Sequence, residues 1–339
     1  MPRRILITGA TGFLGRNTLA SLSGMDDVEV IAACRTPARL PPSFTGEVRA
    51  GDLRDAAYRA AVVRDIDAVC HCGTWGAMWG HAEQEREWFY TPTVDLIEQS
   101  IASGVGRFLL ASTVAIGARP TGAAVDDFAP TATTGFWPHV DRLVELDAFM
   151  RANAHRGTTM VTMRLGHFVG RGNHLGLVPA IIPRLRTRMV PWLAGGRKRM
   201  ALVAGTDLGD GFALAAVAKG LDSYESFNIC GPSFPTSREV FTHVAERSGS
   251  PRPVFSVPYA AGYTFAWLME ALHPLLGGAA PFLTRSIVHV AEDWHCPTDY
   301  AAQRIGYKPS KDWRQAVDEA IEELEASGFG WPRLNQVLA

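Results

Sequence analysis

The sequence lacks an excess of charge of either sign. Its 339 residues carry 33 Lys and Arg against 34 Asp and Glu, a formal net charge of −1. Such a balance provides no basic surface of the kind that attracts nucleic acid or anionic lipid. We therefore expect neither a nucleic-acid partner nor a membrane partner. The two short basic clusters, 184–188 and 197–199, are interpreted as solvated faces, with contact to an anionic ligand as the alternative.

Cysteine is also scarce, and no Cys-x-x-Cys pair occurs. The five cysteines are Cys34, Cys70, Cys72, Cys230 and Cys296. An odd number of cysteines, several of them in apolar runs typical of buried strands, favours reduced thiols in a cytoplasmic protein over a disulfide framework. A zinc site at 70–72 is disfavoured because successive residues of a strand point to opposite faces. His71 is interpreted as a packed histidine, and we expect no metal.

No apolar run is long enough to cross a membrane. The longest, 257–269, is interrupted by Pro258 and Gly262, so that it predicts a buried or lid-forming helix instead. The chain enters a strand-like run almost at once, which leaves no place for a signal peptide. These two features again indicate a cytoplasmic protein.

What the sequence does contain is a glycine-rich turn between a strand-like run and a helix-like segment. Residues 8–15 read Thr-Gly-Ala-Thr-Gly-Phe-Leu-Gly. Gly9 permits a tight turn, Gly12 leaves room for a pyrophosphate, and Gly15 lets the helix pack closely. The unpaired N–H groups of the helix would then meet the phosphates. An ordinary glycine turn is the alternative, which the flanking strand and helix disfavour.

Strand-like and helix-like segments alternate through the first half of the chain. Strands are expected over 5–7, 28–34, 48–52, 67–73, 107–112, 159–165 and 227–231, and helices over 17–22, 93–103, 140–153 and 312–327. This alternation predicts an α/β fold with a doubly wound parallel sheet. The stretches 73–88 and 117–134 are expected to be loops. Because the alternation weakens from about residue 173, we expect a Rossmann domain that binds NADP over 1–172. The rest, 173–339, would be mainly a smaller C-terminal substrate-binding lobe interleaved with the sheet.

The end of the second expected strand carries no acidic residue for the ribose 2′-hydroxyl of NAD. Arg35 stands there instead, where a guanidinium can pair with a 2′-phosphate. This favours NADPH/NADP as the cofactor, with a surface arginine as the alternative. Asp52 and Leu53, at the end of the third expected strand, can hold and cover the adenine. Gly73 would lie beside the cofactor.

Together these residues resemble the extended short-chain dehydrogenase/reductase family, which includes NAD-dependent epimerases and dehydratases, over nearly the whole chain. The matching segments are 8–15, 52–53, Ala111-Ser112 followed by Gly117, 164–170, 227–231 and 304–309. The resemblance implies that Ser112 is catalytic. It implies a cofactor-binding role for Gly9, Thr11, Gly12, Phe13, Leu14, Arg35, Asp52, Leu53, Cys72, Gly73, Leu165, Gly166 and His167. Arg35 matches the family's NADPH-dependent members, such as dihydroflavonol-type reductases.

The catalytic Tyr-x-x-x-Lys motif of that family is missing. The aligned segment begins at Trp137 and ends at Asp141, and no tyrosine occurs between residues 90 and 224. The literal Tyr-x-x-x-Lys at 307–311 belongs to a C-terminal motif of the family and is interpreted as a chance match. The developing oxyanion of a carbonyl reduction must still be met by a proton or by hydrogen-bond donors. Ser112 can donate a hydrogen bond but is a poor acid.

Three interpretations of the missing tyrosine remain open. The protein could bind the cofactor without chemistry, His167 or His139 could donate the proton, or a hydroxyl of the substrate could do so. A few reductases of antibiotic biosynthesis in the family lack the tyrosine. The resemblance therefore implies an NADPH-dependent ketoreductase of a bulky, apolar, polycyclic aromatic (angucyclinone- or polyketide-like) ketone. The alternatives are a non-catalytic NADP-binding sensor and a nucleotide-sugar epimerase or dehydratase. The expected substrate contacts are Trp75, Trp79, Trp137 and Phe168.

Overall fold

A seven-stranded sheet forms the centre of the computed structural model, which describes residues 2–118, 122–276 and 280–327. Its order is β10-β6-β5-β4-β1-β2-β3, and every neighbouring pair is parallel. The strands are β1 (Arg3–Thr8), β2 (Val28–Cys34), β3 (Glu47–Ala50), β4 (Ala68–His71), β5 (Arg107–Thr113), β6 (Thr159–Leu165) and β10 (Tyr224–Ile229). The predicted doubly wound α/β fold is confirmed. The last strand, β10, comes from the second half of the chain.

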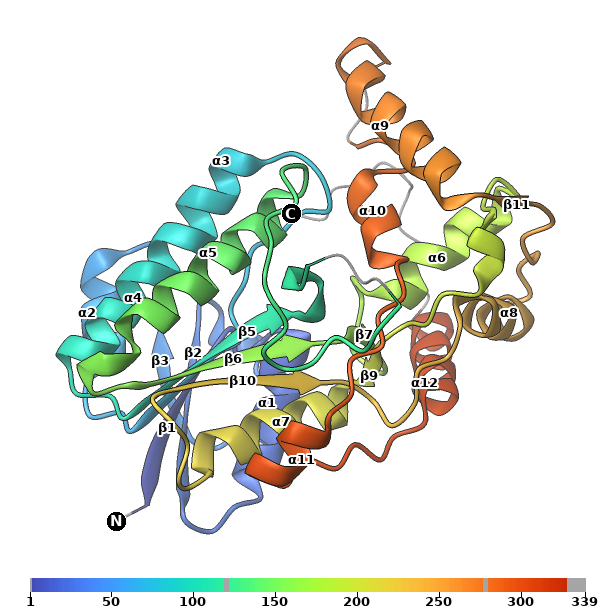
Figure 1. The fold of residues 1–339 in the computed structure, drawn as a ribbon. Coiled ribbons are helices and arrows are strands. Elements are labelled where there is room, and N and C mark those ends of the chain that lie inside the picture. The colour runs from blue at the N-terminus through green and yellow to red at the C-terminus, as the bar shows by residue number, and fades with distance from the viewer. Residues whose placement is uncertain (1, 119–121, 277–279, 328–339) are drawn as a thin grey trace.

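Helices cover both faces of the sheet (Figure 1). One face carries α1 (Phe13–Ser23), α7 (Gly205–Val217) and α11 (Asp299–Ile305), and the other carries α2 (Ala56–Val62), α4 (Thr91–Ala102) and α5 (Pro138–Asn153). Strand β1 shows why two cores form: Leu6 packs into one apolar cluster, whereas Ile5 and Ile7 pack into the other. A strand buried on both faces needs apolar residues throughout, so its sequence is a continuous apolar run.

The remaining elements form a lobe at the carboxyl ends of the strands. Its helices are α6 (Leu177–Arg186), α8 (Ser237–Ser248), α9 (Tyr259–Leu276), α10 (Arg285–Val290) and α12 (Trp313–Ala326), and its strand pairs are β7 (His167–Val169) with β9 (Leu202–Ala204) and β8 (Trp192–Leu193) with β11 (Ser256–Val257). Helices α6, α8 and α12 share a third apolar core. The structure thus confirms the helix expected near the C-terminus.

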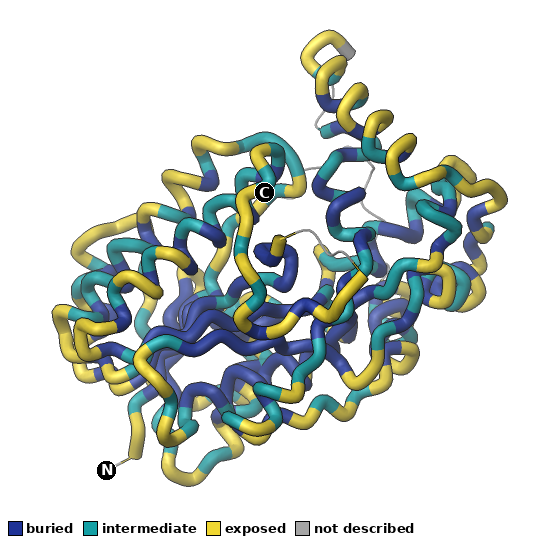
Figure 2. The backbone as a smooth tube through the Cα atoms, in the orientation of Figure 1, coloured by how far each residue is buried: buried dark blue, intermediate teal, exposed yellow. Residues whose placement is uncertain are grey.

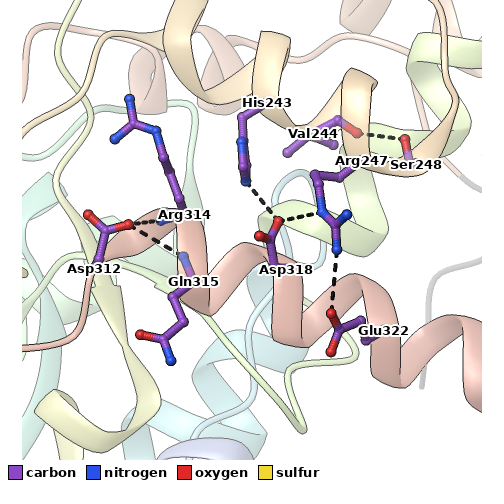
Figure 3. A network of polar contacts seen from close by, with 9 residues as sticks. All are labelled: His243, Val244, Arg247, Ser248, Asp312, Arg314, Gln315, Asp318 and Glu322. Carbon is purple, nitrogen blue, oxygen red and sulfur yellow. Dashed lines mark hydrogen bonds and ion pairs between the residues drawn. The ribbon is translucent and has the colours of Figure 1, made fainter.

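A polar network joins α8 to α12 on the outside of that core (Figure 3). Asp318 accepts a hydrogen bond from Arg247 Nε at 2.9 Å and lies 2.8 Å from His243 Nε2. Arg247 also reaches Glu322 at 3.4 Å. Asp312 caps α12, since its carboxylate accepts from the backbone N–H of the second helical residue at 2.8 Å. The network therefore fixes the C-terminal helix against the lobe.

The sequence predicts a loop over 73–88, but the structure shows that part of this stretch is helical. It becomes helical at α3 (Ala82–Glu85) and continues through a π-helical turn, Arg86–Tyr90, into α4. The N–H of Thr91 bonds to the carbonyl of Arg86, five residues back. Pro92 follows directly and has no N–H to donate, so a widened turn at this point accommodates it.

For helix α9 the structure contradicts one of the two expected alternatives, a buried helix, while the other, a lid-forming helix, stays a prediction. The apolar run 257–269 does form a helix, but that helix stands away from the body of the molecule and is not buried (Figures 1 and 2). Phe265, Trp267 and Leu268 are all exposed. Apolarity alone therefore predicted the helix but not its surroundings. Within the described residues, no helix is long and apolar enough to span a membrane, and no cluster of side chains could hold a metal ion.

Candidate active site

A cleft of about 880 Å³ follows the carboxyl ends of the strands and extends into the lobe. In open parallel sheets this edge is where ligands bind. Ser112 lines the cleft together with all the expected cofactor contacts, namely Gly9, Thr11, Gly12, Phe13, Leu14, Arg35, Asp52, Leu53, Cys72, Gly73, Leu165, Gly166 and His167. The structure thus brings together residues that span more than 150 positions of the sequence.

The turn between β1 and α1 has a backbone that only glycines fit. Gly9 has φ +63°, and a Cβ there would lie 2.6 Å from the backbone of Gly73. A Cβ at Gly15 would lie 2.2 Å from the carbonyl oxygen of Gly9, so this glycine brings the helix close to the turn itself. Gly12 precedes α1 and offers no capping side chain. The first N–H groups of α1 therefore remain available to phosphate oxygens, as a bound dinucleotide requires.

Three arginines surround the far end of the cleft, where β2 and β3 end. Asp52 is occupied by Arg54, which donates to both carboxylate oxygens and lowers the pKa of Asp52, with Arg35 adding to the effect. Arg35 and Arg39 also line the cleft, and neither forms an ion pair among the described residues. Sequence reasoning missed Arg39, which the short turn Pro37–Arg39 brings back to the cleft. Two guanidiniums without carboxylate partners fit a 2′-phosphate.

Ser112 and His167 present unpaired polar atoms at the centre of the cleft. Ser112 lies on β5 and is 6% exposed, and its Oγ has no hydrogen-bond partner in the described structure. His167 Nε2 is likewise enclosed without a partner. Burial lowers the pKa of His167 to about 4, against the opposing effect of a hydrogen bond to the Val290 backbone. The imidazole of His167 is therefore neutral at physiological pH, so the charged form that could donate a proton to the ketone is scarcely populated.

Trp137 and Asp141, the residues expected at the positions of the family's tyrosine and lysine, are both engaged in other contacts. The indole Nε1 of Trp137 donates to the carbonyl of Ala77 at 2.9 Å. Asp141 accepts hydrogen bonds from the backbone N–H of Thr134 at 2.5 Å and of Gly135 at 3.1 Å. These contacts hold two loops against the start of α5, so neither side chain is positioned as an acid.

His139 lines the same cleft two residues after Trp137. Its Nδ1 lies 3.1 Å from Oε2 of Glu85, a fully buried carboxylate whose other oxygen accepts from the N–H of Ala77 at 2.9 Å. Sequence reasoning did not find Glu85, because it was placed in a loop rather than in α3. Among the histidines that line the described cleft, His139 is the one paired with a carboxylate.

The expected aromatic contacts divide between two places. Trp75, Trp137 and Phe168 line the cleft, and Trp75 packs edge-on against Trp88 with the ring centres 5.2 Å apart. Trp79 does not line it. Its ring packs against His273 at 4.6 Å and borders a separate pocket of about 290 Å³. The stretch 73–88 thus both lines the cleft and forms a local aromatic cluster.

Two further interpretations of the sequence can be compared with the structure. Tyr307 is buried and donates to the carbonyl of Cys230 at 2.9 Å, while Lys311 pairs with Glu319, so this Tyr-x-x-x-Lys lies outside the cleft. His71 is packed between the hydroxyls of Thr8 and Thr93 at 2.8 and 3.0 Å. The five cysteines are all buried and free of disulfides.

The chain belongs to the NAD dependent epimerase/dehydratase family, whose model matches residues 5–230. Among its relatives is a 2-alkyl-3-oxoalkanoate reductase of Stenotrophomonas maltophilia (strain K279a), 26% identical over 96% of this chain and 99% of the relative. Another is a 4-hydroxy-2-methyl-3-oxo-4-farnesyl-3,4-dihydroquinoline-1-oxide ketoreductase of Stigmatella aurantiaca, 24% identical over 96% and 98%. A similar fold occurs in DesIV, a dTDP-glucose 4,6-dehydratase of Streptomyces venezuelae solved with NAD and TYD bound. Its TM-score is 0.75 at 19% identity, over 98% of this chain and 99% of that one.

Proposed function

We propose that this protein is an NADPH-dependent ketoreductase that acts on a bulky, polycyclic aromatic ketone without a catalytic tyrosine. The observation that carries the proposal is one open cleft with two differently lined parts. The first part is lined by the glycine turn and by arginines without a carboxylate partner, and the second by Trp75, Trp137 and Phe168. A protein that only sensed the cofactor would have no need of a second, aromatic compartment. The relatives named as an oxoalkanoate reductase and as a dihydroquinoline-1-oxide ketoreductase support the same reaction class.

Within this cleft the chain has separate tasks for its two parts. Residues 1–172 would hold the cofactor, which supplies the hydride when bound, and would place Trp75, Trp137 and Phe168 against the substrate, while residues 173–339 would mainly shape the rest of the substrate compartment. Arg35 and Arg39 would bind the 2′-phosphate. Ser112 would donate its free hydroxyl hydrogen to the ketone oxygen. Orientation of the two reactants then contributes most of the rate, since it is worth several kcal/mol.

The proton, in this proposal, comes from the substrate. Trp137 and Asp141 are held in structural contacts, and burial keeps His167 neutral. A phenol beside the ketone would meet the developing oxyanion directly, with Ser112 or water as a second donor. His139 is the alternative donor, because it lines the cleft and its Nδ1 lies 3.1 Å from the buried carboxylate of Glu85. We further propose a cytoplasmic location and a role in antibiotic biosynthesis.

The decisive experiment compares two quinone-type ketones that differ only in a hydroxyl adjacent to the carbonyl, each assayed with NADPH. The loss of one neutral hydrogen bond lowers a rate by about tenfold at most. Methylating that hydroxyl should lower the rate far more than this, because it removes the proton donor itself. Equal rates for the two ketones, with a collapse of both in His139→Gln, would assign the proton to His139. No turnover of any ketone in such a panel, with NADPH bound, would contradict the proposed function.

A nucleotide-sugar epimerase or dehydratase is the second candidate. It is favoured by the family and by the fold shared with DesIV. A sugar diphosphate needs several polar and basic partners. The lobe end of the cleft is instead mainly apolar, with Leu177, Ile181, Met200 and Phe241, and it has one arginine, Arg184. Turnover of a nucleotide sugar, measured in the same assay, would overturn the ketoreductase proposal.

A further inference from the structure

One arginine stands out in the otherwise apolar lobe end of the cleft. Arg184 lies on the face of α6 that lines the cleft, together with Leu177, Ala180 and Ile181. These positions are three or four residues apart, which places them on one side of a helix. The basic cluster 184–188 is therefore not simply a solvated surface: its first member is turned toward the cleft.

Arg184 has no acidic partner. Its Nη1 donates to the carbonyl of Ala180, one turn back in the same helix, at 2.8 Å. Its Nε is buried and has no partner. No ion pair joins Arg184 to a carboxylate among the described residues, and burial, which nothing offsets, lowers its pKa. Among the described residues that line the cleft, Asp52 is the only acidic one, and Arg54 already pairs with it at the other end.

Two other arginines with an unpartnered Nε, Arg107 and Arg164, are used differently. Arg107 donates to three backbone carbonyls beyond its own strand, at 2.7 to 2.9 Å, and Arg164 donates to two. Neither lines the cleft. Their hydrogen bonds hold segments of the fold together, whereas the single bond of Arg184 stays within α6. A guanidinium kept inside an apolar compartment without a counter-charge is unfavourable unless a ligand supplies that charge.

We propose that Arg184 binds an anionic group of the substrate, a carboxylate carried on the aromatic skeleton at the end remote from the ketone. Ser237, the hydroxyl residue at the same end of the cleft, would donate a second hydrogen bond. The inference rests on the proposed function and adds a requirement to it: the ketone substrate must also carry a carboxylate group. Charge-assisted bonds from a planar guanidinium to a carboxylate are strong and directional. Such an anchor would orient a flat, apolar skeleton along the cleft.

The test measures binding without any reaction. Protein saturated with NADP⁺ is titrated calorimetrically with 2-naphthoate and with the neutral 2-naphthamide. The acid should bind at least about tenfold more tightly than the amide, as a charge-assisted bond predicts. Arg184→Gln should remove this preference, and Arg184→Lys should retain part of it. Arg186→Gln is the matched control, because Arg186 lies in the same turn of α6 but is exposed and does not line the cleft.

The outcomes separate this inference from the proposed function. A preference for naphthoate that depends on Arg184, without turnover of any quinone, would support the anion site while the ketoreductase proposal failed its own test. Equal affinity for acid and amide, or a preference that persists in Arg184→Gln, would overturn the inference. UDP is titrated in parallel. Arg184-dependent binding of UDP, with no preference for naphthoate, would overturn the aromatic acid in favour of a nucleotide diphosphate. Unchanged thermal unfolding of Arg184→Gln checks that the variant is folded.

Discussion

The two ends of the cleft are built in different ways. At the cofactor end, the backbone itself makes the site: Gly9 and Gly15 allow chain segments to approach within distances that no Cβ would permit. At the substrate end, side chains from α5, α6, α8 and α10 make the site, and they come from distant parts of the chain. The first kind of site is recorded in a short sequence motif. The second kind depends on packing, so that its specificity can change while the first remains.

The largest effect should come from breaking the backbone of the cofactor end. Gly9→Ala puts a Cβ 2.6 Å from the backbone of Gly73 at a positive φ, and should weaken NADP⁺ binding about 100-fold or more, because the turn must open. Gly104→Ala is the control: Gly104 also has a positive φ, but a Cβ there would contact nothing. Gly104→Ala should lower the stability of the fold slightly through backbone strain and leave the affinity for NADP⁺ nearly unchanged. Similar NADP⁺ affinities of the two variants, measured by calorimetry, would contradict this account of the turn.

The choice of cofactor depends on a side chain, and its loss should have the next largest effect. The unmutated protein should bind NADPH more tightly than NADH. Arg35→Ala should narrow that difference by about 1.5–3 kcal/mol, the worth of hydrogen bonds between charged groups. Arg64→Ala, which alters an exposed arginine outside the cleft, should leave it unchanged. Equal affinity of the unmutated protein for the two cofactors, by fluorescence titration, would refute NADP specificity.

At the junction of the two ends, Ser112 should matter moderately. Ser112→Ala should lower kcat by no more than about tenfold, because it removes one neutral hydrogen-bond donor. Ser226→Ala is a matched control, since Ser226 is also a buried serine without a partner but does not line the cleft. If kcat fell 100-fold or more in Ser112→Ala but not in Ser226→Ala, the moderate role would be wrong and Ser112 would be an essential hydrogen-bond donor.

Substitution of His167 should lower kcat less than substitution of Ser112, and His167 should add no pH dependence to kcat near neutral pH. With a pKa lowered to about 4, only about one molecule in a thousand carries the charged imidazole at pH 7. The protonated form is lost as the pH rises through 4, so the profile of kcat should contain no step from His167 between pH 5 and 8. His167→Gln should change kcat only a few-fold. A step near neutral pH that this substitution removed would restore histidine as the acid.

The smallest effect on rate should come from Trp137, although it is expected at the position of the family's catalytic tyrosine. Trp137→Phe removes the indole hydrogen bond to Ala77 and part of a buried ring that packs in the core. It should leave kcat within a few-fold and lower the free energy of unfolding by at least about 1 kcal/mol. Chemical denaturation and steady-state kinetics would measure both. A loss of rate beyond 100-fold, the range of a lost general acid, would contradict the structural role.

Much of the fold could be predicted from the sequence because its signals are local. Each central strand is buried on both faces and appears as an apolar run, and the glycine turn fits only one backbone path. Helix α9 shows the limit of such signals. Its apolar residues predicted a helix, but Phe265 and Trp267 are exposed, since burial depends on what packs against a helix rather than on its own composition.

The candidate site could be predicted at the cofactor end and only in part elsewhere. Arg39 and Glu85 were not singled out, because a short turn and a helix in an expected loop bring them to the cleft. Arg184 was noted only within the basic cluster 184–188, where contact with an anionic ligand was the alternative, and the orientation of α6 brings it to the cleft. Trp79 was expected there, yet it packs against His273. In each case the missing information was tertiary: the residue type was visible, but the direction of its side chain was not.

The contacts at the start of α5 make a Tyr-x-x-x-Lys pair difficult to introduce at positions 137 and 141. A change of Trp137 to tyrosine would give up the bond to Ala77 without gaining a lysine partner. A change of Asp141 to lysine would set a cation against the N–H groups of Thr134 and Gly135, which now donate to a carboxylate. Either step alone destabilises the protein before any benefit to catalysis appears. A Tyr-x-x-x-Lys pair could therefore be installed here only by both substitutions together, with new partners for the carbonyl of Ala77 and for the N–H groups of Thr134 and Gly135.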